Sequence, residues 1–178
     1  FHELLPLKTR KILAAFYTKP VAAEILASLA IDAWDTNAMD PACGSGTLAI
    51  SAYRQKMSEW QRKAGRTPSV SEIEALHKRF VEQEITCLDI MPFAAHLTAL
   101  NLSSQTISAR TDFLRVGVMD SLDLAKHNLT RGFNLSPFSA TVQKTLMQHF
   151  KHVGVWSKGA VGANGKGQTF RIKKVDCV

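Results

Sequence analysis

Apolar residues recur at a helical period in the segment that follows Pro20. A period of about 3.6 residues places such positions on one side of a helix. Proline suits the first helical turn, because its missing N–H has no helical partner there. The pattern therefore predicts a helix over residues 21–30, with apolar residues at Val21, Ala22, Ile25, Leu26 and Leu29.

Farther along the chain, short apolar segments alternate with longer segments of helical period. The predicted strands are 38–40, 84–89 and 113–119, and the predicted helices are 47–60, 71–81 and 92–102. The last of these helices would place one apolar set on one side: Phe93, Ala94, Leu97 and Leu100. Strands that alternate with helices are typical of an α/β fold with a parallel sheet.

Turn chemistry sets the bounds of the middle helices. Residues 62–70 are mostly polar and carry glycine and proline, which predicts a loop. Ser71 with Glu74 has the capping-box spacing that begins a helix. Ser69 with Glu72 has the same spacing, so the start of this helix stays open by two residues.

Beyond Leu124 the pattern is weaker. It predicts a helix over 141–150, a glycine-rich loop over 154–167 and a final strand over 170–178. The chain therefore divides into four parts: a helical segment (1–34), an α/β core (35–124), an insertion or loop (125–169) and the start of a fourth strand (170–178).

Composition narrows the class of protein. With 178 residues, 46% of them apolar and 21% charged, the chain has the size and balance of one soluble domain. The net charge of +7 permits a polyanionic partner, although the basic residues are scattered. Three widely spaced cysteines, Cys43, Cys87 and Cys177, suggest reduced thiols in a cytoplasmic protein. No apolar stretch is long enough to span a membrane.

The most informative segment runs from Asp40 to Thr47 and reads Asp-Pro-Ala-Cys-Gly-Ser-Gly-Thr. It lies between a predicted strand and a predicted helix. Glycines at such a turn let a ligand approach the backbone, and the start of the helix offers unpaired N–H groups. An acid at the carboxyl end of the strand is suited to face a cationic group, such as the ammonium of a methionyl moiety.

Two further acids end the next two predicted strands. Asp89 is suited to accept from both hydroxyls of a ribose, Ile90 to pack on an adenine face, and Asp120 to accept from an adenine amino group. Open α/β sheets bind ligands at the carboxyl ends of their strands. Each acid taken singly is explained about as well by a helix cap or a solvated turn.

A dinucleotide site is the main rival. Residues 44–49 fit the G-x-G-x-x-A pattern of dinucleotide-binding folds. In that pattern the ribose acid follows about 20 residues later, and Asp89 lies much farther along the chain. Asp40 would also repel an anionic pyrophosphate. No P-loop pattern occurs, so residues 162–167 are best explained as a flexible connector.

Three segments occur in a fixed order: Phe16-Tyr17-Thr18-Lys19-Pro20, the run from Asp40 to Thr47, and Leu88-Asp89-Ile90. Together they resemble the N6-adenine DNA methyltransferases of restriction-modification systems, above all the modification subunits of type I systems. Met119-Asp120-Ser121-Leu122 resembles the Gly-Asp-Ser-Leu segment of that family. The inserted Lys19 and the Met119 in place of glycine depart from the family pattern. The combination is far more specific than any single motif.

The resemblance implies a doubly wound, Rossmann-like fold that binds S-adenosylmethionine. It implies DNA as the substrate, and specificity and restriction subunits as partners. The cofactor would lie beside residues from four segments: Phe16, Tyr17, Thr18, Pro20, Asp40, Pro41, Ala42, Gly44, Ser45, Gly46, Thr47, Asp89, Ile90 and Asp120.

The family's catalytic segment, Asn-Pro-Pro-Tyr or Asn-Pro-Pro-Phe, does not occur in the sequence. Residues 134–138 are the nearest imitation, and they lack the paired prolines. In the family this segment follows the fourth strand, so we expect it just beyond Val178. We then expect this chain to be the front part of a longer enzyme, with no catalytic residue of its own. A sheet cut at that strand would leave an apolar edge open to self-association.

Other functions are weaker or stay open. No cysteine or acid lies at ligand spacing near His149 and His152, so no metal site is expected. Trp34, Trp60 and Trp156 are best explained by packing. By resemblance the methyl acceptor is adenine in DNA. The alternatives are RNA, a protein amide, or no acceptor at all in a non-catalytic cofactor-binding module.

Overall fold

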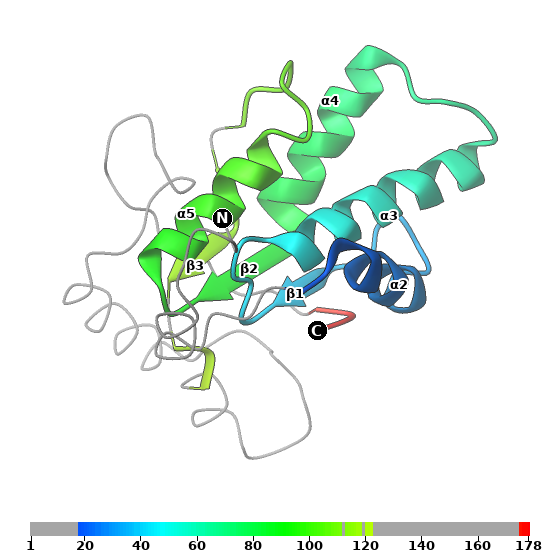
Figure 1. Ribbon diagram of the computed structural model, residues 1–178. Helices are drawn as coiled ribbons and strands as arrows, with labels where there is room; N and C mark the ends of the chain where they lie inside the picture. The colour runs from blue at the N-terminus through cyan, green and yellow to red at the C-terminus, as the bar shows by residue number, and fades with distance from the viewer. Residues whose placement is uncertain (1–17, 112, 119, 123–174) are drawn as a thin grey trace, which may run out of the picture.

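The computed structural model describes residues 18–111, 113–118, 120–122 and 175–178. Three parallel strands form a sheet in the order β1–β2–β3, namely β1 (Ala38–Asp40), β2 (Ile85–Asp89) and β3 (Val116–Val118). The helices are α2 (Pro20–Ala30), α3 (Thr47–Ala64), α4 (Val70–Arg79), a π-helical turn η1 (Phe80–Glu84) and α5 (Pro92–Ser103). Figure 1 shows α2 beside β1 and α5 beside β3, at opposite ends of the sheet.

The C-terminal residues lie against the free side of β1. Cys177 forms a parallel bridge with Ala38, and the Met39 amide donates to the Cys177 carbonyl at 3.0 Å. β1 pairs with β2 on its other side. The C-terminal residues, which follow β3 in the sequence, therefore lie at the opposite edge of the sheet from β3 (Figure 1). The α/β class with a parallel sheet is confirmed, and it is compatible with part of a Rossmann-like fold. Of the predicted strand over 170–178, only residues 175–178 fall within the described part.

The core fills the space between the sheet and the helices. α3 packs on β1 and β2, α5 packs on β2 and β3, and α2 packs against α3. Buried side chains of α3, α4, η1, α5 and strands β2 and β3 meet there, including Tyr53, Phe80, Val81, Cys87 and Leu102. Trp34 and Trp60 pack against this core, as predicted, and Trp156 lies outside the described residues. Cys43, Cys87 and Cys177 carry free thiols.

The apolar side predicted for α5 is only partly buried, because Ala94 is buried while two of its largest residues are exposed. Phe93 and Leu100 are 52% and 65% exposed. The buried residues are instead mostly small: Ala94, Ala95, Thr98, Ala99 and Leu102. Small side chains let the helix approach the sheet closely, and the larger residues are left on the outside. Of the predicted apolar set, Ala94 therefore belongs to the buried side, while Phe93 and Leu100 do not.

Helix α2 shows the same preference for small contact residues. It begins at Pro20, as the sequence predicted, and buries Ala23 and Ala27. Val21 and Leu29 are 67% and 78% exposed. The helical period thus located the helix correctly, while its alanines make the contacts with the rest of the fold.

The boundary between α3 and α4 differs in part from the prediction. α3 continues through residues 62–64, which were predicted as loop, and Gly65 ends it in the left-handed region with φ +66°. Ser69 begins α4 through a capping box with Glu72, so the earlier of the two possible starts is correct. Hydrogen bonds from the Arg66 guanidinium hold the pKa of Glu72 down to about 2.

Two strands are shorter than predicted. Glu84 belongs to the π-helical turn and not to β2, and its carboxylate pairs with Lys56 Nζ at 2.9 Å in the core. Lys56 also donates to the Thr36 carbonyl at 2.6 Å, which joins α3 to the segment before β1. β3 spans only Val116–Val118 of the predicted 113–119.

Candidate functional site

The glycine turn between β1 and α3 has a defined shape. Gly44 and Gly46 have φ values of +53° and +84°, in the left-handed region that favours glycine. The Gly46 amide donates to the Cys43 carbonyl at 2.7 Å and closes the turn. The Cys43 amide donates to the Leu88 carbonyl at 2.8 Å, which attaches the turn to β2. The turn predicted from the sequence is confirmed.

Asp89 binds the turn from the end of β2. Its Oδ2 accepts from the Gly44 amide at 2.8 Å, and its Oδ1 accepts from the Met91 amide at 2.8 Å. A carboxylate oxygen has two lone pairs, so each oxygen retains capacity for another donor. Asp89 can therefore hold the turn and still accept from ligand hydroxyls.

Asp40 is the second acid of the turn. Its Oδ1 accepts from the Ala42 amide at 3.1 Å. Burial raises the pKa of Asp40 above its ordinary value, and the negative charge of Asp89 raises it further, although the Ala42 hydrogen bond acts in the opposite direction. Two acids that repel each other make this a place where a cationic group is favoured.

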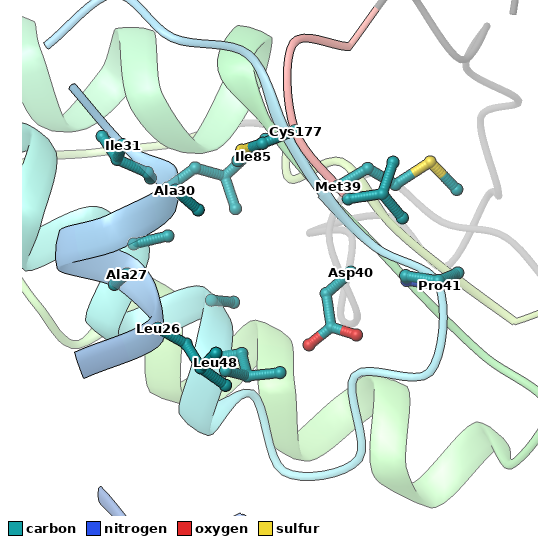
Figure 2. Close-up of a pocket in the computed structure, with 14 residues that line it drawn as sticks. Leu26, Ala27, Ala30, Ile31, Met39, Asp40, Pro41, Leu48, Ile85 and Cys177 are labelled. Carbon is teal, nitrogen blue, oxygen red and sulfur yellow. The ribbon is translucent and has the colours of Figure 1, made fainter. Parts of the chain in front are cut away.

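A cavity of about 390 Å³ opens beside Asp40. Residues of α2, β1, α3 and β2 line it, together with Cys177 and Val178. Figure 2 shows the Asp40 carboxylate directed into this space, with Leu48 and Leu26 on the far side. Asp40 carries the one charged side chain among the described lining residues. An apolar pocket with few polar groups is the usual form of a small-molecule site.

The three acids at the carboxyl edge are staggered. Asp40 pairs in register with Cys87, two residues before Asp89, and Asp89 pairs with Val118, two residues before Asp120. With about 3.3 Å per residue along a strand and about 4.8 Å between strands, Asp40 and Asp89 are about 8 Å apart at Cα. Asp120 Oδ1 accepts from the Leu122 amide at 3.0 Å. The acids thus follow one another along the edge in chain order.

Helix α5 supplies two contacts that the sequence did not predict. Thr98 Oγ1 donates to the Gly44 carbonyl, and Asn101 Nδ2 donates to the Ser45 carbonyl, each at 2.9 Å. The available signal was weak: two polar residues three positions apart within an otherwise apolar helical pattern. That spacing places them on one side of the helix, facing the turn.

The remaining residues predicted to bind the cofactor have fewer contacts with the glycine turn. Thr47 begins α3, and its hydroxyl lies 3.3 Å from that of Ser45. Pro41 lines the cavity, and Ile90 is 64% exposed at the end of β2. Thr18 precedes α2, whose first residue is Pro20. No hydrogen bond between described residues joins Thr18 or Pro20 to the turn. Phe16 and Tyr17 lie outside the described residues.

Searches for other kinds of site and for relatives give negative findings. Within the described ranges, no group of three or more histidine, cysteine or acidic side chains is arranged to hold a metal ion. No helix in the same ranges is both long and apolar enough to cross a membrane. No protein-family model matches the sequence, and no curated protein matches it either.

Proposed function

We propose that this chain is the S-adenosylmethionine-binding part of an adenine-N6 DNA methyltransferase. The observation that carries the proposal is the hydrogen bond between the glycine turn and Asp89, with Asp40 beside it. Asp40 also faces an open cavity, which Gly44, Gly46 and Asp89 do not line. This arrangement agrees with the order of motifs in the sequence. We infer that the sheet is the first part of a doubly wound fold, because the chain returns to the free side of β1.

The charges along the carboxyl edge fit the shape of this cofactor. S-adenosylmethionine carries its ammonium and sulfonium at one end, its ribose in the middle and its adenine at the other end. Asp40 would face the cationic end, Asp89 would accept from the ribose hydroxyls, and Asp120 would accept from the adenine amino group. Burial is the main cause of the raised pKa of Asp40, and the charge of Asp89 adds to it. A cation at Asp40 would offset both effects, which supports a cationic group at this end of the edge.

The same charges disfavour a dinucleotide. A pyrophosphate at the glycine turn would lie beside both Asp40 and Asp89, and each added negative charge would raise the repulsion. Dinucleotide folds place their pyrophosphate at this turn. The turn is therefore better suited to a zwitterionic amino-acid moiety than to a phosphate.

The proposal that DNA is the methyl acceptor rests on the family resemblance and on the net charge of the chain. The net charge of +7 suits a nucleic acid. The Asn-Pro-Pro-aromatic segment of the family has no counterpart among residues 1–178. We therefore assign cofactor binding to residues 1–178, and the proposal of methyl transfer rests on the resemblance alone. RNA, a protein amide, or a non-catalytic module are the alternatives.

Thermal unfolding with a panel of ligands tests the class of cofactor. A ligand that binds only the folded state raises stability by about 2.7 kcal/mol at 100 times its Kd. S-adenosylmethionine and S-adenosylhomocysteine should raise the melting temperature, and NAD should not. Asp40→Asn should reduce the shift, while the exposed control Asp35→Asn should preserve it. A shift with NAD alone would favour the dinucleotide alternative.

The acceptor needs a separate assay. Label transferred from methyl-labelled S-adenosylmethionine to adenine in DNA by the protein that carries the catalytic segment would support the proposal. Transfer to RNA or to a protein amide would show that the proposed acceptor is wrong and that the proposed cofactor is right. Cofactor binding without transfer to any of the three would favour the non-catalytic module.

A further inference from the structure

Helix α5 holds the glycine turn by its carbonyl groups. Thr98 Oγ1 donates to the Gly44 carbonyl and Asn101 Nδ2 donates to the Ser45 carbonyl, each at 2.9 Å. Thr98 has no exposed surface, so its hydroxyl is not solvated as an alternative to this bond. Both donors come from residues more than 50 positions away from the turn in the chain.

The contact between α5 and the turn is also close. A Cβ atom added to Gly46 would lie 3.0 Å from both Thr98 Cγ2 and Thr98 Oγ1. Real Cβ atoms essentially never lie closer than this to another heavy atom. The threonine side chain therefore fills the space beneath the turn, in addition to donating to it.

These bonds determine where the amides of the turn point. In a planar trans peptide the C=O and the following N–H point in opposite directions. The Gly44 carbonyl points to Thr98, so the Ser45 N–H points away from α5. The next peptide has the same arrangement, with its carbonyl bound to Asn101 and the Gly46 N–H bound to the Cys43 carbonyl.

One amide of the turn is then left for a ligand. The Gly44 amide is bound to Asp89, and the Gly46 amide is bound within the turn. No described residue accepts a hydrogen bond from the Ser45 amide. Its orientation, away from α5, makes it a donor for an anionic group such as the carboxylate of an amino-acid moiety.

We propose that Thr98 and Asn101 are positioning residues, which fix the carbonyls of Gly44 and Ser45 and thereby aim the Ser45 amide at the cofactor. Neither side chain touches the ligand in this account. The proposal rests on the proposed function for the identity of the ligand. Its claim about the geometry of the turn does not depend on the ligand.

A matched pair of threonine substitutions tests the proposal. Thr98→Val removes the hydroxyl bound to Gly44, while Thr106→Val removes a buried hydroxyl that lies 3.0 Å from Tyr53 Oη, away from the turn. Both changes are nearly isosteric and each removes one buried hydrogen bond, so similar losses of stability are expected. Thr98→Val alone should weaken S-adenosylmethionine binding, by roughly three- to tenfold.

Two more variants separate positioning from simple packing. Thr98→Ser retains the hydroxyl and should recover most of the affinity that Thr98→Val loses. Asn101→Leu removes the second donor and should weaken binding to a similar extent as Thr98→Val. Equal Kd values for Thr98→Val, Thr106→Val and the unchanged protein would overturn the proposal.

Amide NMR of the protein without cofactor gives an independent readout. Thr98→Val should shift the Ser45 and Gly46 amide resonances and speed their hydrogen exchange, while Thr106→Val should leave both unchanged. Unchanged Ser45 and Gly46 amides in Thr98→Val would overturn the positioning role, whatever the ligand. If the unchanged protein fails to bind S-adenosylmethionine, the proposed function fails, and the NMR comparison still decides the role of Thr98.

Discussion

The amide of Gly44 donates to Oδ2 of Asp89, 45 positions later in the chain, across 2.8 Å. The other oxygen of the same carboxylate accepts from the Met91 amide at 2.8 Å. One side chain therefore fixes the glycine turn to the end of β2 and also shapes the start of α5. Stability and ligand binding should both depend on it.

Substitution of Asp89 by asparagine should destabilise the protein by about 1–3 kcal/mol, the cost of leaving a buried donor without its acceptor. Asparagine has one oxygen, so its amino group would face one of the two amide N–H groups. Urea denaturation measures the loss. Asp120→Asn is the control, because Asp120 accepts from one amide, that of Leu122, and is not bound to the turn. Equal losses of stability in Asp89→Asn and Asp120→Asn would contradict the role of the Gly44–Asp89 hydrogen bond in stabilising the fold.

Asp40 should behave in the opposite way. Burial raises its pKa above the ordinary value of 3.8. At pH values between 3.8 and the folded pKa of Asp40, the folded protein binds more protons than the unfolded chain. The ionised carboxylate of Asp40 therefore lowers the stability of the fold at pH values above its folded pKa. This cost decreases as the pH falls through the folded pKa. Asp40→Asn should therefore raise the melting temperature at neutral pH by a few degrees, and should weaken cofactor binding.

Melting curves at neutral pH and near pH 4 check the sign for Asp40. The gain from Asp40→Asn should be present at neutral pH and should shrink in acid, where the native carboxyl takes up a proton. Asparagine retains the oxygen that accepts from the Ala42 amide, so the variant changes the charge and little else. A lower melting temperature at neutral pH would mean that the charge of Asp40 is stabilised in the folded protein.

Two glycines in the left-handed region provide a matched pair. Gly46→Ala and Gly65→Ala each force alanine into this region, at a cost of roughly 1–2 kcal/mol. The new Cβ at position 46 would also press on Thr98 at 3.0 Å, while nothing lies within 4 Å of the new Cβ at position 65. Gly46→Ala should therefore cost about 1 kcal/mol more, the lower end of overpacking costs.

A double-mutant cycle isolates the contact at Gly46. Thr98→Ala removes the two side-chain atoms nearest the new Cβ and leaves Thr98 Cα at 3.2 Å, so it should recover part of the loss caused by Gly46→Ala. Purely additive losses would show that the Thr98 side chain is not what makes glycine necessary at position 46. Guanidinium denaturation of the four proteins gives the coupling energy.

The burial of His77 should make the folded protein less stable in acid. It is fully buried, and its Nδ1 lies 3.0 Å from Tyr53 Oη. Burial lowers the pKa of His77 below the ordinary value of 6.5. Below 6.5 the unfolded chain binds the proton more readily, so stability falls as the pH drops from there toward the folded pKa. His77→Gln should flatten this part of the pH profile, and the exposed control His96→Gln should not. Parallel profiles for His77→Gln and the unchanged protein would refute the assignment.

The elements that the sequence located correctly are those with local signals. Pro20 begins α2, the glycines precede α3, and the capping box at Ser69 begins α4. Each signal acts within one turn of chain, so the surrounding fold is not needed to interpret it. Asp40 and Asp89 at strand ends were predictable for the same reason, because strands of an α/β sheet end where their apolar runs end.

The errors arose where packing decided the outcome. Phe93 and Leu100 were placed on the apolar side of α5, but they are exposed, and Ala95 and Ala99 are buried instead. Glu84 lies in a π-helical turn, where it pairs with Lys56, a residue on another helix. Such outcomes depend on distances between elements, which no local pattern encodes.

The contacts of Thr98 and Asn101 with the turn are of the same kind. Their partners, Gly44 and Ser45, lie 54 and 56 positions away in the chain. A threonine and an asparagine on an apolar helix predict some buried partner, since buried polar groups are hydrogen-bonded. The identity of that partner follows only from the register of β1 against β2 and the placement of α5 on the sheet.

Titration calorimetry of S-adenosylmethionine into the folded protein tests the central claim most directly. We predict binding at one site, weakened by about tenfold or more in Asp40→Asn, since a lost charge-assisted bond is worth about 1.5–3 kcal/mol. The control Asp35→Asn should bind as the unchanged protein does. No binding to the folded protein, or equal affinity in Asp40→Asn, would contradict the assignment of the glycine turn and Asp40 to this cofactor.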